Sequence, residues 1–189
     1  GSQALCGRDH AGCCHGPVFL SFIETVYVNH LVNITLSRQA RKEAVARAMS
    51  ATGLLREMVR EGTTLDRRDE EFLRRYRLRR ILCPLSESGE CRIFANRPVS
   101  CRLFDLTAEQ RIAAMADVAT SLAKISGEVY FALTSQFLGE TEFLFFLGEV
   151  VSGRFVQTFF HHLLGDAAGR PVKEKVGPEQ DKRFERPLP

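Results

Sequence analysis

The six cysteines of this 189-residue chain lie in two short clusters, and both have the spacing of metal ligands. The first cluster, residues 6–15, holds three thiols and two imidazoles: Cys6, His10, Cys13, Cys14 and His15. The second, residues 83–102, holds Cys83, Cys91 and Cys101. Thiolates carried by Gly- and Pro-containing loops bind zinc or iron–sulfur clusters. The sequence therefore predicts a metal centre.

Disulfide bonds and reduced core thiols are the two other interpretations of these cysteines. Small secreted domains use disulfide frameworks. Here about seventy residues without Cys separate the clusters, and that stretch is long enough to form a helical core without such bonds. Cys13 and Cys14 are also neighbours, and a disulfide between neighbours is strained. Both observations argue against disulfides, and the spacing of the cysteines favours a metal over reduced core thiols.

The candidate ligands are Cys6, His10, Cys13, Cys14, Cys83, Cys91 and Cys101. Tetrahedral zinc and a four-iron cluster each need four protein ligands, so a single site leaves some candidates unused. Two zinc ions would need one bridging thiolate, or His15 as a further ligand. The thiolate-rich set favours an iron–sulfur cluster or iron, and zinc is the alternative.

The elements that carry the two clusters are predicted to be mostly helical. Ser21 and Glu24 have the form of a capping box, which opens a helix to about Ile34. Ser37 can cap a second helix that ends at Gly62. Steps of three and four predict its buried face to be Ala44, Ala48, Ala51, Leu55 and Met58.

The chain between the second helix and the second cluster is charged. A helix is expected from Thr64 or Asp66 to Arg80, with seven arginines in residues 67–80. Periodicity is then lost in residues 81–105, where a loop with one short strand at residues 91–94 is expected.

The C-terminal part begins with a second capping box, Thr107 and Gln110, which opens a long helix that Gly127 breaks or bends. Two apolar segments follow at residues 140–151 and 154–164. The inward face of the long helix is predicted to be Ile112, Met115, Ala119, Leu122, Val129 and Leu133.

Together these elements predict a mainly α fold, a helical bundle with an irregular cysteine-rich metal-binding loop region at one end. Residues 1–165 form a single metal-binding domain, and residues 166–189 an extended or poorly ordered tail. The composition, 44% hydrophobic and 26% charged, is ordinary for a soluble globular protein. The longest aliphatic-aromatic run is too short for a membrane span, and we expect a cytoplasmic protein.

Both clusters resemble the YkgJ-type cysteine-cluster family, a CxxCxxCC zinc- or iron-chelating domain. Cys6-x3-His10-x2-Cys13-Cys14 is similar to its N-terminal element, with His10 in place of a second cysteine. The second element of the family is similar to four stretches of this chain: Cys83-Pro84-Leu85, Gly89-x-Cys91-Arg92-Ile93-Phe94, Arg97-Pro98 and Cys101-Arg102. The resemblance implies a zinc or iron site. Some relatives are labelled iron–sulfur oxidoreductases, and flagellin lysine-N-methylases carry a similar cysteine element.

Three functions are compatible with these features. The first is a metal-binding protein that holds an iron–sulfur cluster or iron and has a redox role. The second is a structural zinc module that binds a protein partner. The third is a nucleic-acid binder that uses residues 67–80, which the net charge of +3 argues against.

The sequence assigns no catalytic residue. It has no dinucleotide-binding loop, S-adenosylmethionine motif or Ser-His-Asp arrangement. His30 lies in the apolar first helix and is expected to pack in the core of the protein. His161 and His162 are neighbours on the last helix, so they cannot bind one ion from the same face.

Overall fold

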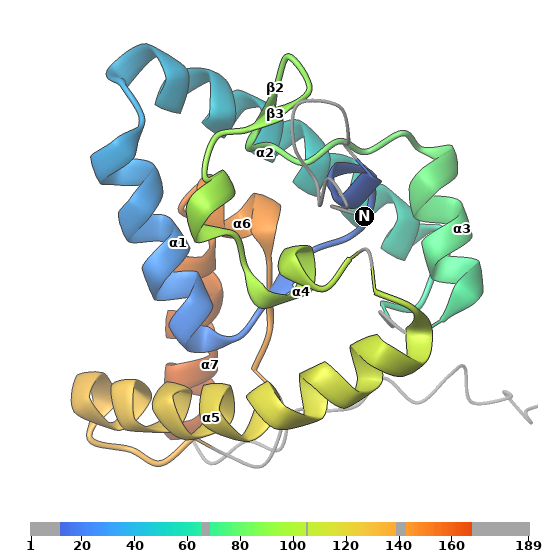
Figure 1. Ribbon diagram of the computed structural model, residues 1–189. Coiled ribbons are helices and arrows are strands. Elements are labelled where there is room, and N and C mark those ends of the chain that lie inside the picture. The colour runs from blue at the N-terminus through green and yellow to red at the C-terminus, as the bar shows by residue number, and fades with distance from the viewer. Residues whose placement is uncertain (1–11, 66–68, 105, 139–142, 168–189) are drawn as a thin grey trace, which may run out of the picture. The chain divides into compact units, whose positions relative to one another are not determined.

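The computed structural model describes residues 12–65, 69–104, 106–138 and 143–167, and it confirms a mainly helical chain. The chain divides into two compact units, Gly1–Val156 and Gln157–Pro189. The helices shown in Figure 1 are α1 (Phe22–Thr35), α2 (Arg38–Arg60), α3 (Glu70–Leu78), α4 (Val99–Arg102), α5 (Ala108–Thr134), α6 (Leu147–Val151) and α7 (Phe155–Ala167).

Strands and 3-10 turns are short. The strands are β1 (Phe19–Leu20), β2 (Ser86–Glu87), β3 (Glu90–Cys91) and β4 (Phe145–Phe146). β1 pairs with β4 and β2 pairs with β3, both antiparallel. The 3-10 turns are η1 (Gly12–His15) and η2 (Phe94–Asn96). Among the described residues, none of the helices combines the length and apolar character required to span a bilayer.

Both expected capping boxes form. The Ser21 hydroxyl accepts a hydrogen bond from the Glu24 amide, and the Glu24 carboxylate accepts one from the Ser21 amide. Thr107 and Gln110 make the same reciprocal pair at the start of α5. These local bonds satisfy backbone donors that a helix start leaves without partners, and they fix where α1 and α5 begin.

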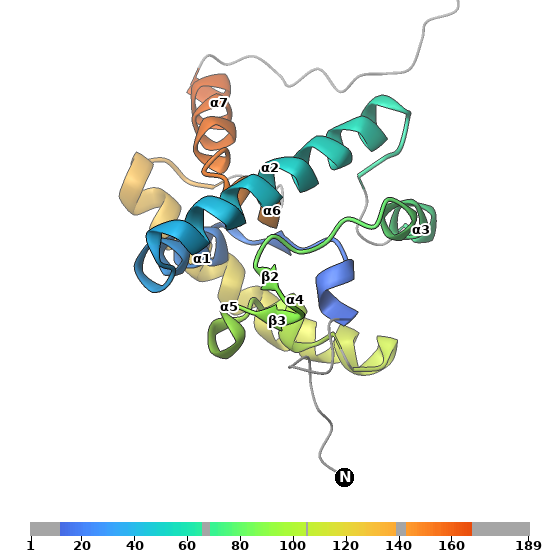
Figure 2. The same ribbon diagram turned by 90° about the horizontal axis from the view of Figure 1, so that it is seen from above.

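The core of the first unit lies between α2, α6 and α1. The Ser37 hydroxyl caps α2, and Gly62 adopts a positive φ after its end. The predicted apolar face of α2, from Ala44 to Met58, is buried as expected. α6 packs against both α1 and α2, and Figure 2 shows α2 crossing over it. Gly148 permits this close approach, since a Cβ at this position would lie 2.7 Å from the Thr52 hydroxyl oxygen.

The charged helix starts later than the sequence predicted. α3 begins at Glu70, because the Asp69 carboxylate caps it by accepting from the amides of Glu71 and Phe72. Thr64 lies outside the helix, and Asp66 is not among the described residues. Aspartate is a strong N-cap residue, and here it determines the boundary.

The inward face predicted for α5 is wrong at both ends. Ile112 is 72% exposed and Leu133 is 64% exposed, whereas the buried residues of this helix are Ser126 and Tyr130. The Ser126 hydroxyl accepts a hydrogen bond from the Ile23 amide, and Tyr130 packs edge-on against Phe22. Contacts with α1, rather than the apolar pattern, therefore set the rotation of α5. Gly127 does not break the helix.

Several expectations fall on residues outside the described ranges. These are the two N-terminal ligands Cys6 and His10, most of the segment 166–189, and residues 140–142 of the predicted apolar segment. The rest of that segment forms β4 and α6, and the last helix forms as α7. His30 is exposed on α1, so it is not the core histidine that the sequence predicted.

Candidate metal centre

Two of the candidate ligands lie in the 3-10 turn η1. Cys13 and Cys14 are 5% and 3% exposed, and the neighbouring His15 is exposed. Cys83 and Phe104 pack against the two buried thiols. A short turn of this kind presents consecutive side chains in different directions, which allows both thiols to contact groups from the distant second cluster.

The second cluster folds back onto this turn through a backbone hydrogen bond. The Cys83 amide donates to the Cys14 carbonyl at 2.7 Å. On α2, the Arg47 Nε donates to the Pro84 carbonyl at 3.0 Å and so holds the start of the loop against the helix. The two clusters, about seventy residues apart in sequence, are thus in direct contact.

Cys91 lies on a tight hairpin rather than on a strand that continues to residue 94. β2 and β3 pair Ser86 with Cys91, and the two residues between the strands, Ser88 and Gly89, both have positive φ. This is the backbone of a two-residue hairpin turn, for which Gly is favoured. The pairing places Cys91 beside Ser86, which is 3% exposed.

Cys101 is carried by the short helix α4, and η2 lies between the hairpin and this helix. Pro98 precedes α4, and its carbonyl accepts the amides of Cys101 and Arg102. The start of α4 is tied to α1, because the Glu24 carboxylate accepts the Val99 amide at 2.9 Å. One carboxylate therefore caps α1 and positions the helix that carries Cys101.

All five cysteines of the described residues line one cavity. Its volume is about 10 Å³, and the remaining wall is mostly apolar. The lining residues are Cys13, Cys14, Cys83, Cys91, Cys101, Leu85, Ile93, Arg97, Pro98 and Leu147. The structure thus brings together every predicted ligand that it describes.

The thiols interact with one another inside this cavity. Hydrogen bonds from Cys13 and Cys83, with a further one from Ser86, hold the pKa of Cys14 well below its usual value. The bond to Cys14 and burial raise the pKa of Cys83. A hydrogen bond from Cys13 lowers the pKa of Cys101. Hydrogen bonds from neighbouring thiols thus favour the thiolate form of Cys14 and Cys101, and the thiolate is the form of cysteine that binds metals.

Only one of the arginines near the second cluster lines the cavity. Arg97 lies there and stacks over the Phe94 ring at 4.2 Å. Arg92 pairs with Glu87 at 3.0 Å. Arg102 donates to the carbonyls of Arg97 and Ala95. Of the three arginines Arg92, Arg97 and Arg102, Arg97 is therefore the one placed to offset negative charge on the cysteines.

The arrangement does not have ligand geometry as it stands. Within the described ranges, no group of three or more Cys, His, Asp or Glu side chains is spaced to hold a metal ion. The sulfur atoms instead form the hydrogen-bonded set described above. Cys6 and His10, the other two candidate ligands, lie outside the described residues.

Sequence patterns missed three residues of this region: Ser86, Arg47 and Leu147. Ser86 is part of the segment that follows Cys83, but a lone serine carries no ligand signal. Arg47 lies among other charged residues on α2, and Leu147 lies far along the chain on α6. Their roles depend on contacts between distant segments, which spacing along the sequence does not contain.

Three of the four arginines in residues 70–79 pair with carboxylates. Glu71 binds Arg74 at 2.7 Å and Arg75 at 2.8 Å. Arg79 pairs with Glu61 and with Glu57. The two pairs of Glu71 join residues three and four positions apart, which lie next to each other on the surface of a helix.

No protein-family model, curated protein sequence or solved structure matches the chain.

Proposed function

We propose that this chain is a metal-binding protein that holds an iron–sulfur cluster through its two cysteine-rich segments and uses it in redox chemistry. The observation that carries the proposal is the single cavity lined by Cys13, Cys14, Cys83, Cys91 and Cys101. Several cysteine sulfurs on one small cavity are the kind of donor set that binds zinc and iron–sulfur clusters.

The donor set fits a sulfur-ligated metal. Every polar lining residue of the cavity other than Arg97 is a cysteine, and the rest of the wall is Leu, Ile and Pro. Such surroundings exclude water and hard oxygen ligands, and they select zinc or iron over calcium or magnesium. Cys6 and His10 complete the proposed ligand set. A bound iron–sulfur cluster would supply one-electron transfer.

The resemblance to the YkgJ-type family points to the same function. The matching positions Cys83, Cys91 and Cys101 all line the cavity, as does Arg97 of the Arg-Pro element. Membership of that family is part of the proposal and accounts for the order of the two clusters.

A structural zinc site in an interaction module is the second candidate. The volume of about 10 Å³ favours it, because this is room for one atom rather than for a four-iron cluster. Zinc bound between η1 and the second cluster would link segments far apart in sequence. Such a site contributes folding free energy on the order of 10 kcal/mol.

Replacing Cys91 tests the proposal. Cys91→Ser removes one thiol from the hairpin, so it should lower the metal content per chain and the melting temperature together. Ser88→Asn in the same hairpin is the control, since Asn tolerates the positive φ of this position. Full metal loading in Cys91→Ser would remove Cys91 from the ligand set, and metal-free wild-type protein would remove the function altogether.

A further inference from the structure

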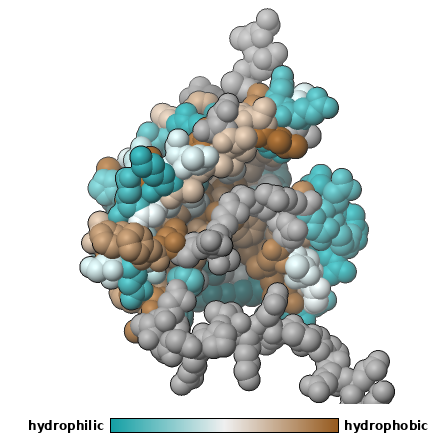
Figure 3. All heavy atoms as spheres, turned by 90° about the horizontal axis from the view of Figure 1, so that it is seen from below, coloured by the Kyte–Doolittle hydropathy of each residue, from teal (hydrophilic) through white to brown (hydrophobic). Residues whose placement is uncertain are grey.

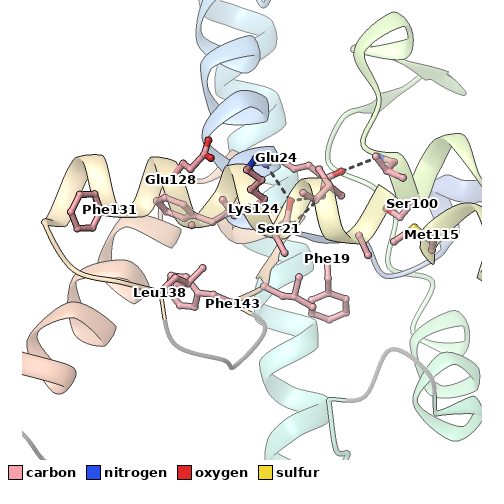
Figure 4. Close-up of a pocket in the computed structure, with 18 of the residues that line it drawn as sticks. Phe19, Ser21, Glu24, Ser100, Met115, Lys124, Glu128, Phe131, Leu138 and Phe143 are labelled. Atoms are coloured by element: carbon pink, nitrogen blue, oxygen red, sulfur yellow. Dashed lines mark hydrogen bonds between the residues drawn. The ribbon is translucent and has the colours of Figure 1, made fainter. Parts of the chain in front are cut away.

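A second and much larger cavity lies in the first unit, beside the cysteine cavity. Its volume is about 680 Å³, and it lies between α5, the start of α1, α4 and the segment before β4 (Figure 4). This volume falls within the range of small-molecule binding sites, about 300 to 1,000 Å³. Figure 3 shows apolar side chains gathered toward the middle of the face seen from below.

Small residues on α5 explain why the cavity is not filled by the protein. Ala119, Ala123 and Gly127 follow one another at steps of four and line one wall. A Cβ built at Gly127 would meet no heavy atom within 4 Å. Side chains of ordinary size at these three positions would occupy the space that is open here.

The lining also contains five phenylalanines. Phe19 and Phe22 come from the N-terminal segment, Phe143 from the segment before β4, and Phe131 and Phe137 from the end of α5 and beyond. Phe22 stacks on Phe143 with ring centroids 6.2 Å apart. Rings arranged around a cavity favour aromatic ligands, because offset and edge-on contacts add to the gain from burial.

Most polar groups of the cavity already have partners within the protein. The Glu24 carboxylate accepts from the Ser21 amide, the Ser21 hydroxyl and the Val99 amide. The Ser126 hydroxyl accepts from the Ile23 amide. A ligand that covers these groups therefore leaves these hydrogen bonds in place, and it needs few polar groups itself.

The remaining charges disfavour an anion. Lys124 and Glu128 lie one turn apart on α5, and Glu24 adds a second carboxylate. The lining therefore carries two carboxylates and one ammonium group. An acidic ligand would be repelled, and a neutral one would not.

We infer that this cavity binds a neutral aromatic molecule of about two or three rings. Val99 and Ser100 line it, and Cys101, the next residue, lines the cysteine cavity. A bound molecule would therefore lie against the helix that carries Cys101. The inference goes beyond the metal-binding function and does not depend on it.

Fluorescence titration with N-phenyl-1-naphthylamine, a neutral aromatic probe, tests the inference. The wild-type chain should bind it saturably. Gly127→Leu places a side chain in the cavity and should weaken binding at least about tenfold. Gly53→Leu on α2 is the matched control, because its Cβ also meets nothing within 4 Å and it does not line the cavity. This control should bind like the wild type.

Two further measurements complete the test. Ala123→Phe fills the same cavity from another position and should also block the probe, which keeps the test valid if one variant fails to fold. The sulfonated analogue 8-anilino-1-naphthalenesulfonate should bind more weakly than the neutral probe. Probe binding as tight as that of the wild type in both cavity variants, or tighter binding of the sulfonate than of the neutral probe, would overturn the inference. Metal content measured on the same samples reports separately on the cysteine centre.

Discussion

The Cys83 amide donates a hydrogen bond of 2.7 Å to the carbonyl of Cys14, so the two cysteine-rich segments are joined through their backbones as well as through their thiols. This bond aligns the start of the 83–102 segment with the turn η1. A metal bound to both segments would strengthen a junction that already exists. A residue outside the cavity, Arg47, also holds this junction through the Pro84 carbonyl.

Arg47→Ala should weaken the junction without removing a thiol. The Arg47 Nε donates to the Pro84 carbonyl at 3.0 Å, next to Cys83. Loss of this bond should cost about 1 kcal/mol in the free energy of unfolding and lower metal retention against a chelator. Lys42→Ala, at an exposed position of the same helix, is the control. Equal chelator sensitivity of both variants would contradict a role for Arg47.

Gly148→Ala should be strongly destabilising. The added methyl would lie 2.7 Å from both the Thr52 hydroxyl oxygen and a ring carbon of Phe146, where α6 meets α2. Overpacking of this kind costs about 1 to 3 kcal/mol. Gly53→Ala, on α2 with open space around its Cβ, should be neutral or stabilising. Chemical denaturation of the two variants measures the difference, and similar midpoints would show that α6 is not packed as described.

Ser126→Ala should destabilise the contact between α5 and α1. The Ser126 hydroxyl is buried and accepts the Ile23 amide at 3.2 Å. Its removal leaves that amide without this acceptor, at a cost of about 1 to 2 kcal/mol. Ser121→Ala, exposed on the same helix, should change the unfolding free energy by much less. A larger effect at Ser121 would mean that α5 is rotated differently.

Tyr76 gives the protein a specific sensitivity to alkaline pH. Burial, and then the negative charge of the nearby Cys83 in its thiolate form, raise the pKa of Tyr76 above its ordinary value. The unfolded chain therefore ionises first, at a pH near about 10, and the free energy of unfolding should fall as the pH rises beyond that point. In Tyr76→Phe this decline should be shallower. Parallel stability curves for the two proteins between pH 9 and 11, a window set by these values, would contradict the account.

Local patterns predicted much of the helical framework. The capping boxes at Ser21 and Thr107 depend on residues three positions apart, and both form. The buried face of α2 also follows from its own sequence, since its partner α6 meets a continuous stripe of small and apolar residues. In these cases the information lies within a few turns of one helix.

Other features depend on distant contacts and could not be predicted in this way. The rotation of α5 is set by Ser126 and Tyr130 against α1, which overrides an apolar pattern that included Ile112 and Leu133. For the candidate metal centre, spacing alone identified the cysteines. The positions of Ser86 and Arg47 beside them required the fold.

Metal analysis of wild-type protein purified without oxygen and without added metal tests the central claim most directly. Iron with matching acid-labile sulfide, together with a broad absorption band near about 400 nm, is the result that the proposed iron–sulfur centre predicts. One or two zinc ions in a colourless sample would replace it with the structural zinc site. Protein that contains no metal and takes up neither iron nor zinc on reconstitution would contradict a metal centre at these cysteines.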